Sequence, residues 1–392
     1  LSDMPKPLKI FLCDLTYDTI ILVSDTIPIN IGYIGSYAKS VFNEKISVKL
    51  FKYPQEAIDA IKEEKPDLVC LSNYSWNSNL SEYVASIAKK INPNVVTAQG
   101  GPNFPHDDVQ QIDFLKNRPS TDIFMIMEAE MTIVNLINRI IHCKLNRKKI
   151  FSLPIDGTVF IRPESSESNK LFKGAPSSRI KNLDEIPSPY LNGMLDRFFD
   201  GKLAPFIETN RGCPFKCSFC HTGNDYFNKI NMFSAERINA EIDYIGKKAD
   251  ALGISHLHIA DTNFGMYPRD REITQALYDS HKKYNWPNSI MSTTGKNQKQ
   301  RVIDITNVLG NMFEVSMSAQ SMDANVLDNI RRSNISLDAY KGIIKHLQDS
   351  GRSTNAELIM PLPGETKESF INGISKIVDS GIASLTIYTL ML

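Results

Sequence analysis

The feature that most constrains the fold is a regular alternation between short apolar runs and amphipathic helical segments. The first 145 residues contain five apolar runs of strand length and four segments with helical spacing, which follow the first, second, third and fifth runs. The strands are expected at LKIFLCDL (8–15), ISVKLFKY (46–53), DLVCLSNYS (67–75), NVVTAQGG (94–101) and DIFMIME (122–128), and the helices at 31–42, 55–65, 79–91 and 131–141. Because strand–helix–strand repeats form parallel sheets with right-handed crossovers, residues 1–145 are predicted to form an α/β domain around a parallel sheet.

A second alternation begins at residue 205 and predicts six further strand–helix units. Its strands are expected at 206–210, 256–261, 289–294, 313–319, 356–361 and 384–390. Six such units make an incomplete barrel, so residues 205–392 are predicted to form a partial (β/α)6 barrel, and the natural polypeptide is expected to continue beyond Leu392. The intervening residues 146–204 include a stretch rich in Ser, Pro and Gly and are predicted to be a linker.

Charge and composition exclude several classes of protein. The chain has 44 Lys and Arg and 44 Asp and Glu, so its net charge is zero and gives no basic footprint for non-specific nucleic-acid binding. No segment approaches the roughly 20 apolar residues that span a bilayer, and the first residues lack the ordered regions of a signal peptide. The sequence therefore favours a cytoplasmic protein with no nucleic-acid or membrane partner.

Three of the six cysteines, Cys213, Cys217 and Cys220, stand at the spacing C-x3-C-x2-C. They follow the first strand of the second alternation, in the kind of loop where parallel barrels assemble their active sites. A structural zinc site needs four ligands, and the neighbourhood offers only His221 as a fourth. An iron–sulfur cluster held by three thiolates leaves one iron without a cysteine, which is useful if that iron binds a substrate.

The segment ETNRGCPFKCSFC, with an aromatic residue before the last cysteine, resembles the radical S-adenosylmethionine (SAM) superfamily. Together with the preceding α/β domain, about residues 8–392 resemble the subclass with a cobalamin-binding domain, the class B radical SAM methylases. Further segments agree in their order: ADTNFGM (260–266), TTGKN (293–297), SAQSMDANVLDNIRRSN (318–334) and LIMPLPGETKESF (358–370). The resemblance implies an N-terminal Rossmann-like sheet of the cobalamin-binding type, followed by a partial TIM-like barrel.

The resemblance also implies roles for residues of the second domain. Cys213, Cys217 and Cys220 would hold a [4Fe–4S] cluster whose open iron binds SAM, and an electron from the cluster would cleave SAM to a 5′-deoxyadenosyl radical. An electron donor such as flavodoxin or ferredoxin is implied. The side chains expected to contact SAM are Phe219, Asp261, Asn263, Lys296, Gln320 and Arg332. For Lys296 and Arg332, a solvated surface charge is an equally weighted alternative.

The first domain resembles cobalamin-binding domains with two departures. Many carry Asp-x-His-x-x-Gly, whose His ligates cobalt, but the only His in residues 1–140 is His106. The usual Gly-Glu-Gly-Glu of the fifth strand is replaced by Met-Glu-Ala-Glu at 127–130. The residues expected to contact cobalamin are Ser72, Tyr74, Trp76, Gly100, Gly101, Glu128 and Glu130, at the carboxyl ends of the strands. Trp76 is expected either to face the lower side of the corrin or to be a hydrophobic plug.

These features favour a cobalamin-dependent radical SAM enzyme that methylates an unactivated carbon of a small molecule or peptide. A cyclase or rearrangement enzyme with the same cofactors is one alternative, and a non-catalytic, zinc-stapled cobalamin carrier is another. A tRNA methylthiotransferase is disfavoured because it places three further cluster-binding cysteines in the first domain. There, Cys13 and Cys70 are the plausible positions, and both fall in apolar strand runs that predict core packing.

Overall fold

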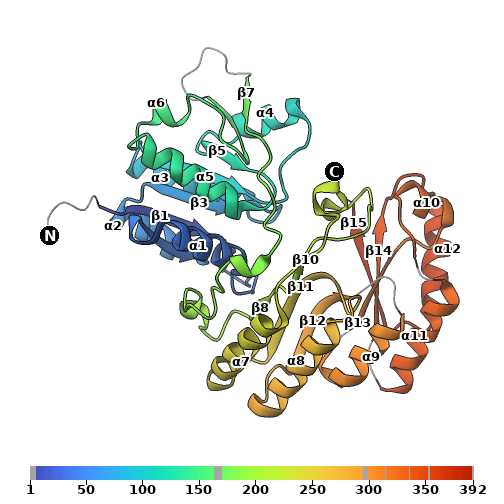
Figure 1. The fold of residues 1–392 in the computed structure, drawn as a ribbon. Helices are drawn as coiled ribbons and strands as arrows, with labels where there is room; N and C mark the ends of the chain where they lie inside the picture. Colours follow the sequence, from blue (N-terminus) through green and yellow to red (C-terminus); the bar gives the residue numbers. More distant parts are fainter. Residues whose placement is uncertain are drawn as a thin grey trace. The chain divides into compact units, whose positions relative to one another are not determined.

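The computed structural model describes residues 6–162, 170–294, 299–313, 315–334, 336–351 and 354–390. The chain divides into two compact units, Leu1–Phe198 and Phe199–Leu392 (Figure 1). Among the helices of the described residues, none is both long enough and apolar enough to cross a membrane.

The first unit is built on a seven-stranded sheet with the order β2-β1-β3-β4-β5-β6-β7. Strands β1 to β5 are parallel, as predicted, and β6 and β7 are added antiparallel. The strands are β1 (Leu8–Cys13), β2 (Ile46–Phe51), β3 (Leu68–Ser72), β4 (Val96–Gly100), β5 (Ile123–Met125), β6 (Thr158–Ile161) and β7 (Leu171–Lys173). Because the chain leaves β1 toward β2 and then returns to β3 on the other side, the switch point where such sheets bind ligands lies beside β1.

Helices pack on this sheet in two pairs, α1 beside α5 and α2 beside α3, as in a doubly wound fold (Figure 1). The helices are α1 (Ile29–Phe42), α2 (Pro54–Glu64), α3 (Ser78–Ile91), α4 (Asp108–Lys116), α5 (Ala129–His142) and α6 (Arg147–Ile150). The central strands are buried on both faces, which explains their continuous apolar runs. Cys13 and Cys70 are buried in β1 and β3, so the prediction that they are core residues is confirmed.

The structure differs from the predicted linker at residues 146–204. This range contributes β6 and β7, and β6 pairs with β5 through Phe124 and Val159. Phe160 and Phe172 then stack at 5.5 Å between ring centroids. The two strands have only four and three residues, too few for a period-2 pattern to stand out in the sequence.

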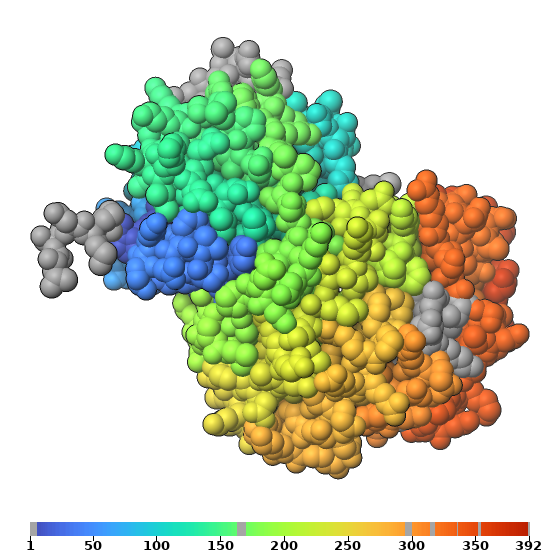
Figure 2. All heavy atoms as spheres, viewed as in Figure 1, coloured from blue at the N-terminus to red at the C-terminus, as the bar shows by residue number. Residues whose placement is uncertain are grey.

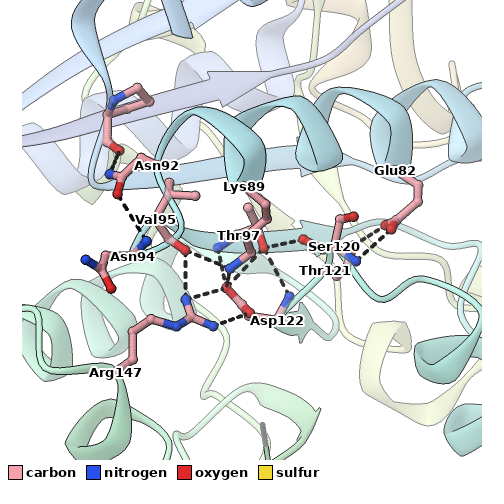
Figure 3. Close-up of polar contacts among 11 residues, drawn as sticks. Glu82, Lys89, Asn92, Asn94, Val95, Thr97, Ser120, Thr121, Asp122 and Arg147 are labelled. Carbon is pink, nitrogen blue, oxygen red and sulfur yellow. Dashed lines mark hydrogen bonds and ion pairs between the residues drawn. The ribbon is translucent and has the colours of Figure 1, made fainter. Parts of the chain in front are cut away.

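A buried ion-pair network joins elements at the amino-terminal end of β5 (Figure 3). Asp122 pairs with Lys89 of α3 and with Arg147 of α6, whose Nη2 lies 2.6 Å from Oδ1. The backbone N–H of Thr97 donates to the same carboxylate at 2.9 Å. Burial by itself raises the pKa of Asp122, but the hydrogen bonds from Arg147 and the charges of Lys89 and Arg147 outweigh it and hold that pKa below its ordinary value. This network therefore ties α3, α6, β4 and β5 together, away from the carboxyl ends of the strands.

The second unit is built on a parallel six-stranded sheet whose strands follow chain order, β15-β14-β13-β12-β11-β8. The six strands agree with the predicted partial barrel: β8 (Phe206–Ile207), β11 (His256–Phe264), β12 (Ser289–Thr294), β13 (Val315–Gln320), β14 (Thr354–Met360) and β15 (Ser384–Thr389). In the described residues β8 and β15 pair with no further strand, so the sheet is open there.

Helices cover one side of this sheet (Figure 1), and Figure 2 shows yellow and orange segments of the second unit at its surface. They are α7 (Ala235–Leu252), α8 (Asp270–Tyr284), α9 (Lys299–Leu309), α10 (Ala324–Asn329), α11 (Leu337–Asp349) and α12 (Lys367–Val378). Local sequence fixes their ends: the Ser234 side chain accepts from the backbone N–H of Arg237 at the start of α7, and Gly253 ends that helix with a φ of +66°. Thr366 and Ser369 form a capping box at the start of α12.

Candidate functional site

The three clustered cysteines lie on one loop of the second unit. The loop connects β9 (Asn210–Arg211) and β10 (Asn231–Met232), which pair antiparallel. Cys213 and Cys217 are buried, Cys220 is half-buried, and none of the three forms a disulfide. The loop therefore holds three free thiols close to the carboxyl ends of the barrel strands, where a parallel barrel assembles its chemistry.

The start of this loop requires glycine. Gly212 has a φ of +119°, and a Cβ there would stand 2.5 Å from the carbonyl oxygen of Lys229 and 2.7 Å from that of Phe227. The backbone N–H of Cys213 donates to the same Phe227 carbonyl at 2.9 Å. The backbone of Gly212 thus packs directly against residues 227–229, in the second half of the loop. This packing fixes the position of the adjacent Cys213.

The carboxyl end of β11 holds the base of the loop through three consecutive side chains, the first of which is Asp261. Its carboxylate accepts from the backbone N–H of Thr209 at 2.8 Å and from Nδ2 of Asn210 at 2.7 Å. The Thr209 hydroxyl donates to the same carboxylate. Burial raises the pKa of Asp261 to about 7, although the hydrogen bonds from Thr209 oppose the shift. Its contact with SAM stays a prediction; what the structure places around it is the strand that leads into the cysteine loop.

The next two residues of β11 contact the cysteine segment itself. The hydroxyl of Thr262 donates to the carbonyl oxygen of Gly212 at 3.1 Å. The amide Nδ2 of Asn263 lies 3.4 Å from the Sγ of Cys213 and 3.0 Å from Oγ1 of Thr262. Asn263 was predicted at this site, whereas Thr262 was missed, because nothing in the sequence indicates which backbone carbonyl a strand-end hydroxyl will meet.

Arg332 reaches the cysteines from the segment after α10. Its side chain is buried, with 6% of the residue exposed, and Nη1 lies 4.0 Å from the Sγ of Cys217. Nε donates to Oδ1 of Asn334 at 2.8 Å, and Nη2 donates to the carbonyl oxygen of Ser318. The alternative of a solvated surface charge is therefore excluded for Arg332.

Of the three remaining residues predicted to contact SAM, Phe219 lies on this loop and Gln320 is the last residue of β13. Phe219 is partly buried against the apolar cluster that contains Val326 and Ile330. Gln320 ends β13 with a φ of +64°, the left-handed region that non-glycine residues seldom adopt. Lys296 lies outside the described residues. The ligand contacts of Phe219, Gln320 and Lys296 stay predictions.

The residues at this loop fit an iron–sulfur cluster and SAM. The loop carries three free thiols, and that of Cys217 lies 4.0 Å from the buried guanidinium of Arg332, whose positive charge suits the negative charge of a thiolate-ligated cluster. Among the described residues, the buried acceptors without a hydrogen-bond partner include Oδ1 of Asn263 and Oε1 of Gln320, both at carboxyl ends of strands. Such atoms are expected to gain a partner from a bound ligand.

A site for a single metal ion and a site for an iron–sulfur cluster place different requirements on the three cysteines. Within the described ranges, no three His, Cys, Asp or Glu side chains are arranged to hold one metal ion. A cubane cluster does not require that convergence, because each thiolate binds a different iron atom.

In the first unit, five of the seven residues predicted to contact cobalamin, Ser72, Tyr74, Trp76, Gly100 and Gly101, lie at or just after the carboxyl ends of β3 and β4. Tyr74 and Trp76 stack with ring centroids 4.5 Å apart and planes inclined by 6°, and 46% of Trp76 is exposed. The alternative of a buried hydrophobic plug therefore does not describe Trp76 within this unit. Ser72 accepts from Nδ2 of Asn77 at 2.9 Å, which anchors the turn that presents the two rings.

A buried amide network supports this edge and was missed in the sequence. Nδ2 of Asn73 donates to Gln99, and Nδ2 of Asn103 donates to Oδ1 of Asn73 at 2.9 Å. Gly101 has a φ of +141°, and a Cβ there would collide with the carbonyl of Asn73. The run of Asn and Ser in NYSWNSN was the available signal, but the partners Gln99 and Asn103 come from another strand and its loop. Gly100 and Gly101 thus leave a stretch of backbone without side chains beside the hydrogen-bonded amides of Asn73, Gln99 and Asn103.

The fifth-strand segment shows how the chain accommodates its departure from the family pattern. Met127, at the position of the usual first glycine, has a φ of +61°. Glu128 pairs with Arg179 at 2.8 Å, and Glu130 is buried in the first turn of α5. Met127 therefore adopts the left-handed backbone conformation that glycine adopts most readily. The cobalamin contacts of these residues stay predictions.

Comparison with protein families agrees with this division of the chain. Residues 207–377 match the Radical SAM superfamily, and residues 19–137 match the B12 binding domain.

Two curated relatives match over most of the chain. It is 30% identical over 372 residues to the cobalamin-dependent radical SAM methyltransferase TokK of Streptomyces tokunonensis, covering 91% of this chain and 52% of the relative. It is 29% identical over 370 residues to the 2-(S-pantetheinyl)-carbapenam-3-carboxylate methyltransferase of Streptantibioticus cattleyicolor, with the same coverage of 91% and 52%. The chain thus spans about half the length of these two relatives.

Solved structures support the fold. TsrM from Kitasatospora setae, with cobalamin and a [4Fe–4S] cluster bound, superposes with a TM-score of 0.72 at 11% identity, covering 98% of this chain and 73% of that one. OxsB with aqua-cobalamin and SAM bound gives a TM-score of 0.68 at 16% identity, covering 95% and 52%. From the family matches, the chain contains a Radical SAM domain preceded by a B12 binding domain.

Proposed function

We propose that this protein is a cobalamin-dependent radical SAM methyltransferase that acts on an unactivated carbon of a small molecule. The observation that carries the proposal is the loop of Cys213, Cys217 and Cys220, which is fixed at its base by β11 and faced by the buried cation of Arg332. When bound, the cluster supplies the electron that cleaves SAM, and the corrinoid supplies the methyl group.

The protein side chains bind and orient these groups. Arg332 is placed to attract the carboxylate of SAM, since a charge-assisted contact is strong in a partly dry site. Oδ1 of Asn263 and Oε1 of Gln320 offer acceptors to the amino group or the ribose hydroxyls. Phe219 offers an apolar face for the adenine.

In the first unit, the exposed stack of Tyr74 and Trp76 offers a flat apolar surface suited to a corrin ring. The backbone at Gly100 and Gly101 allows a ligand to approach closely, because neither residue has a side chain. Ser72 helps to hold that edge in place. An electron donor such as flavodoxin or ferredoxin completes the proposal.

The reaction class is tested by its products. The chain is reconstituted anaerobically with iron, sulfide and cobalamin and incubated with SAM and a reductant. The probe is 2-(S-pantetheinyl)-carbapenam-3-carboxylate, after which the relative in Streptantibioticus cattleyicolor is named. Methyl transfer to carbon predicts both 5′-deoxyadenosine and S-adenosylhomocysteine, with a product heavier by one CH2. The absence of 5′-deoxyadenosine from cluster-loaded protein, with this probe and without it, would contradict the proposal.

A second candidate is a radical ring closure with the same cofactors. It is favoured by the relative in Rubrivivax gelatinosus, the anaerobic magnesium-protoporphyrin IX monomethyl ester cyclase, which is 22% identical over 86% of this chain and matches over 59% of its own length. Ring closure predicts 5′-deoxyadenosine without stoichiometric S-adenosylhomocysteine and a product that gains no carbon. The same incubation therefore separates the two reactions.

A further inference from the structure

Among the described residues, each thiol of the cysteine loop has a side-chain hydrogen-bonding partner, and the three partners differ in chemistry. Cys213 faces the amide Nδ2 of Asn263 at 3.4 Å, and Cys217 faces the guanidinium Nη1 of Arg332 at 4.0 Å. Cys220 lies 3.2 Å from the hydroxyl Oγ1 of Thr222. The three donors come from β11, from the segment after α10 and from the loop itself.

The direction of the amide is fixed by its neighbours. The hydroxyl hydrogen of Thr262 is used toward the carbonyl of Gly212, so its Oγ1 can only accept from Asn263. The amide nitrogen of Asn263, and not its oxygen, must therefore face Thr262. Its second hydrogen is then available to donate to the Sγ of Cys213.

The guanidinium is fixed in the same manner. Two of its three nitrogens donate to Asn334 and Ser318, and the third is left for Cys217. Asn334 is itself held, since its Nδ2 donates to the carbonyls of Ala319 and Ser321 at 2.8 and 3.0 Å. The hydrogen bonds to Asn334 and Ser318 therefore hold the buried Arg332 side chain in the rotamer that places Nη1 near the Sγ of Cys217.

At Cys220 the hydroxyl takes the donor role once the sulfur is a thiolate, because a thiolate has no hydrogen to give. Hydrogen bonds and positive charge at the sulfur atoms stabilise the form of a cluster that carries the extra electron, so they raise its reduction potential. A charged donor acts more strongly than a neutral one in a buried site.

We propose that Asn263, Arg332 and Thr222 together set the reduction potential of the cluster, one donor for each thiolate, with Arg332 giving the largest share. This inference rests on the proposed function, because it requires that the three cysteines hold the cluster. Asn263, Arg332 and Thr222 are positioning residues in this role, since they act on the iron through the sulfur atoms.

The test is a redox titration of the reconstituted whole chain, followed by the electron paramagnetic resonance of the reduced cluster, without SAM. Omitting SAM separates this role from any part that Arg332 or Asn263 has in binding it. The variants are Arg332→Met and Arg332→Lys, Asn263→Leu, and the matched pair Thr222→Val and Thr222→Ser. Lys345→Met is the control, because Lys345 is an exposed cation of α11 whose pair is Asp349.

We expect Arg332→Met to lower the ratio of reduced to oxidised cluster at a fixed solution potential about tenfold, which is about 59 mV for a one-electron couple. Arg332→Lys restores part of that loss. Asn263→Leu and Thr222→Val lower the ratio by a smaller factor, whereas Thr222→Ser and Lys345→Met leave it at the wild-type value.

Two results would overturn the inference in distinguishable ways. If the wild-type chain takes up no iron–sulfur cluster, both the proposed function and this inference fail. If clusters form with wild-type iron content and the ratio is unchanged in Arg332→Met and Thr222→Val, the inference fails and the proposed function stands. Should Arg332→Met lose its cluster, the Thr222 pair decides, because Thr222→Val replaces the hydroxyl with a methyl group of similar size, whereas Thr222→Ser keeps the hydroxyl.

Discussion

Asp122→Asn is expected to destabilise the first unit strongly, because it removes the one carboxylate that pairs with two cations in Figure 3. Only 7% of the Asp122 side chain is exposed, and Lys89 and Arg147 are also largely buried. Leaving a buried charge without its partner typically costs about 3–5 kcal/mol. The matched control is Asp243→Asn, whose side chain is 58% exposed and pairs with Lys283, and which is expected to cost about 0–1 kcal/mol.

The pH dependence of this difference follows from the lowered pKa of Asp122. A carboxyl group with a lowered pKa in the folded state contributes stability that is fully present above its unfolded pKa of about 3.9. That contribution is lost as the pH falls below this value, so the gap between the wild type and Asp122→Asn is expected to be full at pH 7 and to narrow below about pH 4.

The assay is thermal and denaturant unfolding of the whole chain at pH 7 and at lower pH. A loss of 3–5 kcal/mol in a unit of this size corresponds to a fall in Tm of roughly 6–20 °C. Equal Tm values for Asp122→Asn and Asp243→Asn would refute the reasoning, since they would show that burial of the pair adds nothing.

Three further substitutions test other parts of the structure. Gly212→Ala should lower both the Tm and the iron bound per chain, because the new Cβ would meet two carbonyl oxygens. The control Gly253→Ala is also at positive φ but has open space around it, so it should bind as much iron as the wild type. Equal iron content in the two variants would contradict this prediction. Met127→Gly should stabilise the chain by about 1 kcal/mol in denaturant unfolding, because it relieves a left-handed φ, and a loss of stability would speak against strain there. For Asp261, whose folded pKa is raised to about 7, the unfolding free energy relative to Asp261→Asn should fall as the pH rises from about 4 to about 7, by at most about 1.4 kcal/mol per pH unit; a difference that does not change with pH would disprove the shift.

Much of the fold could be predicted because its signals are local. The parallel strands are continuous apolar runs since both faces are buried, and the start of α7 is marked by Ser234 beside its first turn. The short β6 and β7 carry too few residues to show a period, and their pairing with β5 depends on contacts that are distant in sequence.

Part of the candidate site could be predicted because it, too, is marked by a local sequence pattern. The cysteines were found because their spacing is local, and Asn263 and Arg332 were predicted by resemblance. The hydrogen bonds of Asp261 to Thr209 and Asn210 join residues about fifty positions apart, so no sequence pattern reveals them. Thr222 was missed because a hydroxyl two residues after a cysteine is common in loops of every kind.

Whether the cysteine loop holds an iron–sulfur cluster is decided by metal and sulfide analysis of anaerobically reconstituted protein, beside a variant with Cys213, Cys217 and Cys220 replaced by Ala. We expect brown wild-type protein with the iron and sulfide of one cubane cluster, production of 5′-deoxyadenosine from SAM, and a colourless variant that produces none. Wild-type protein that carries zinc or no metal at this loop would contradict the central claim.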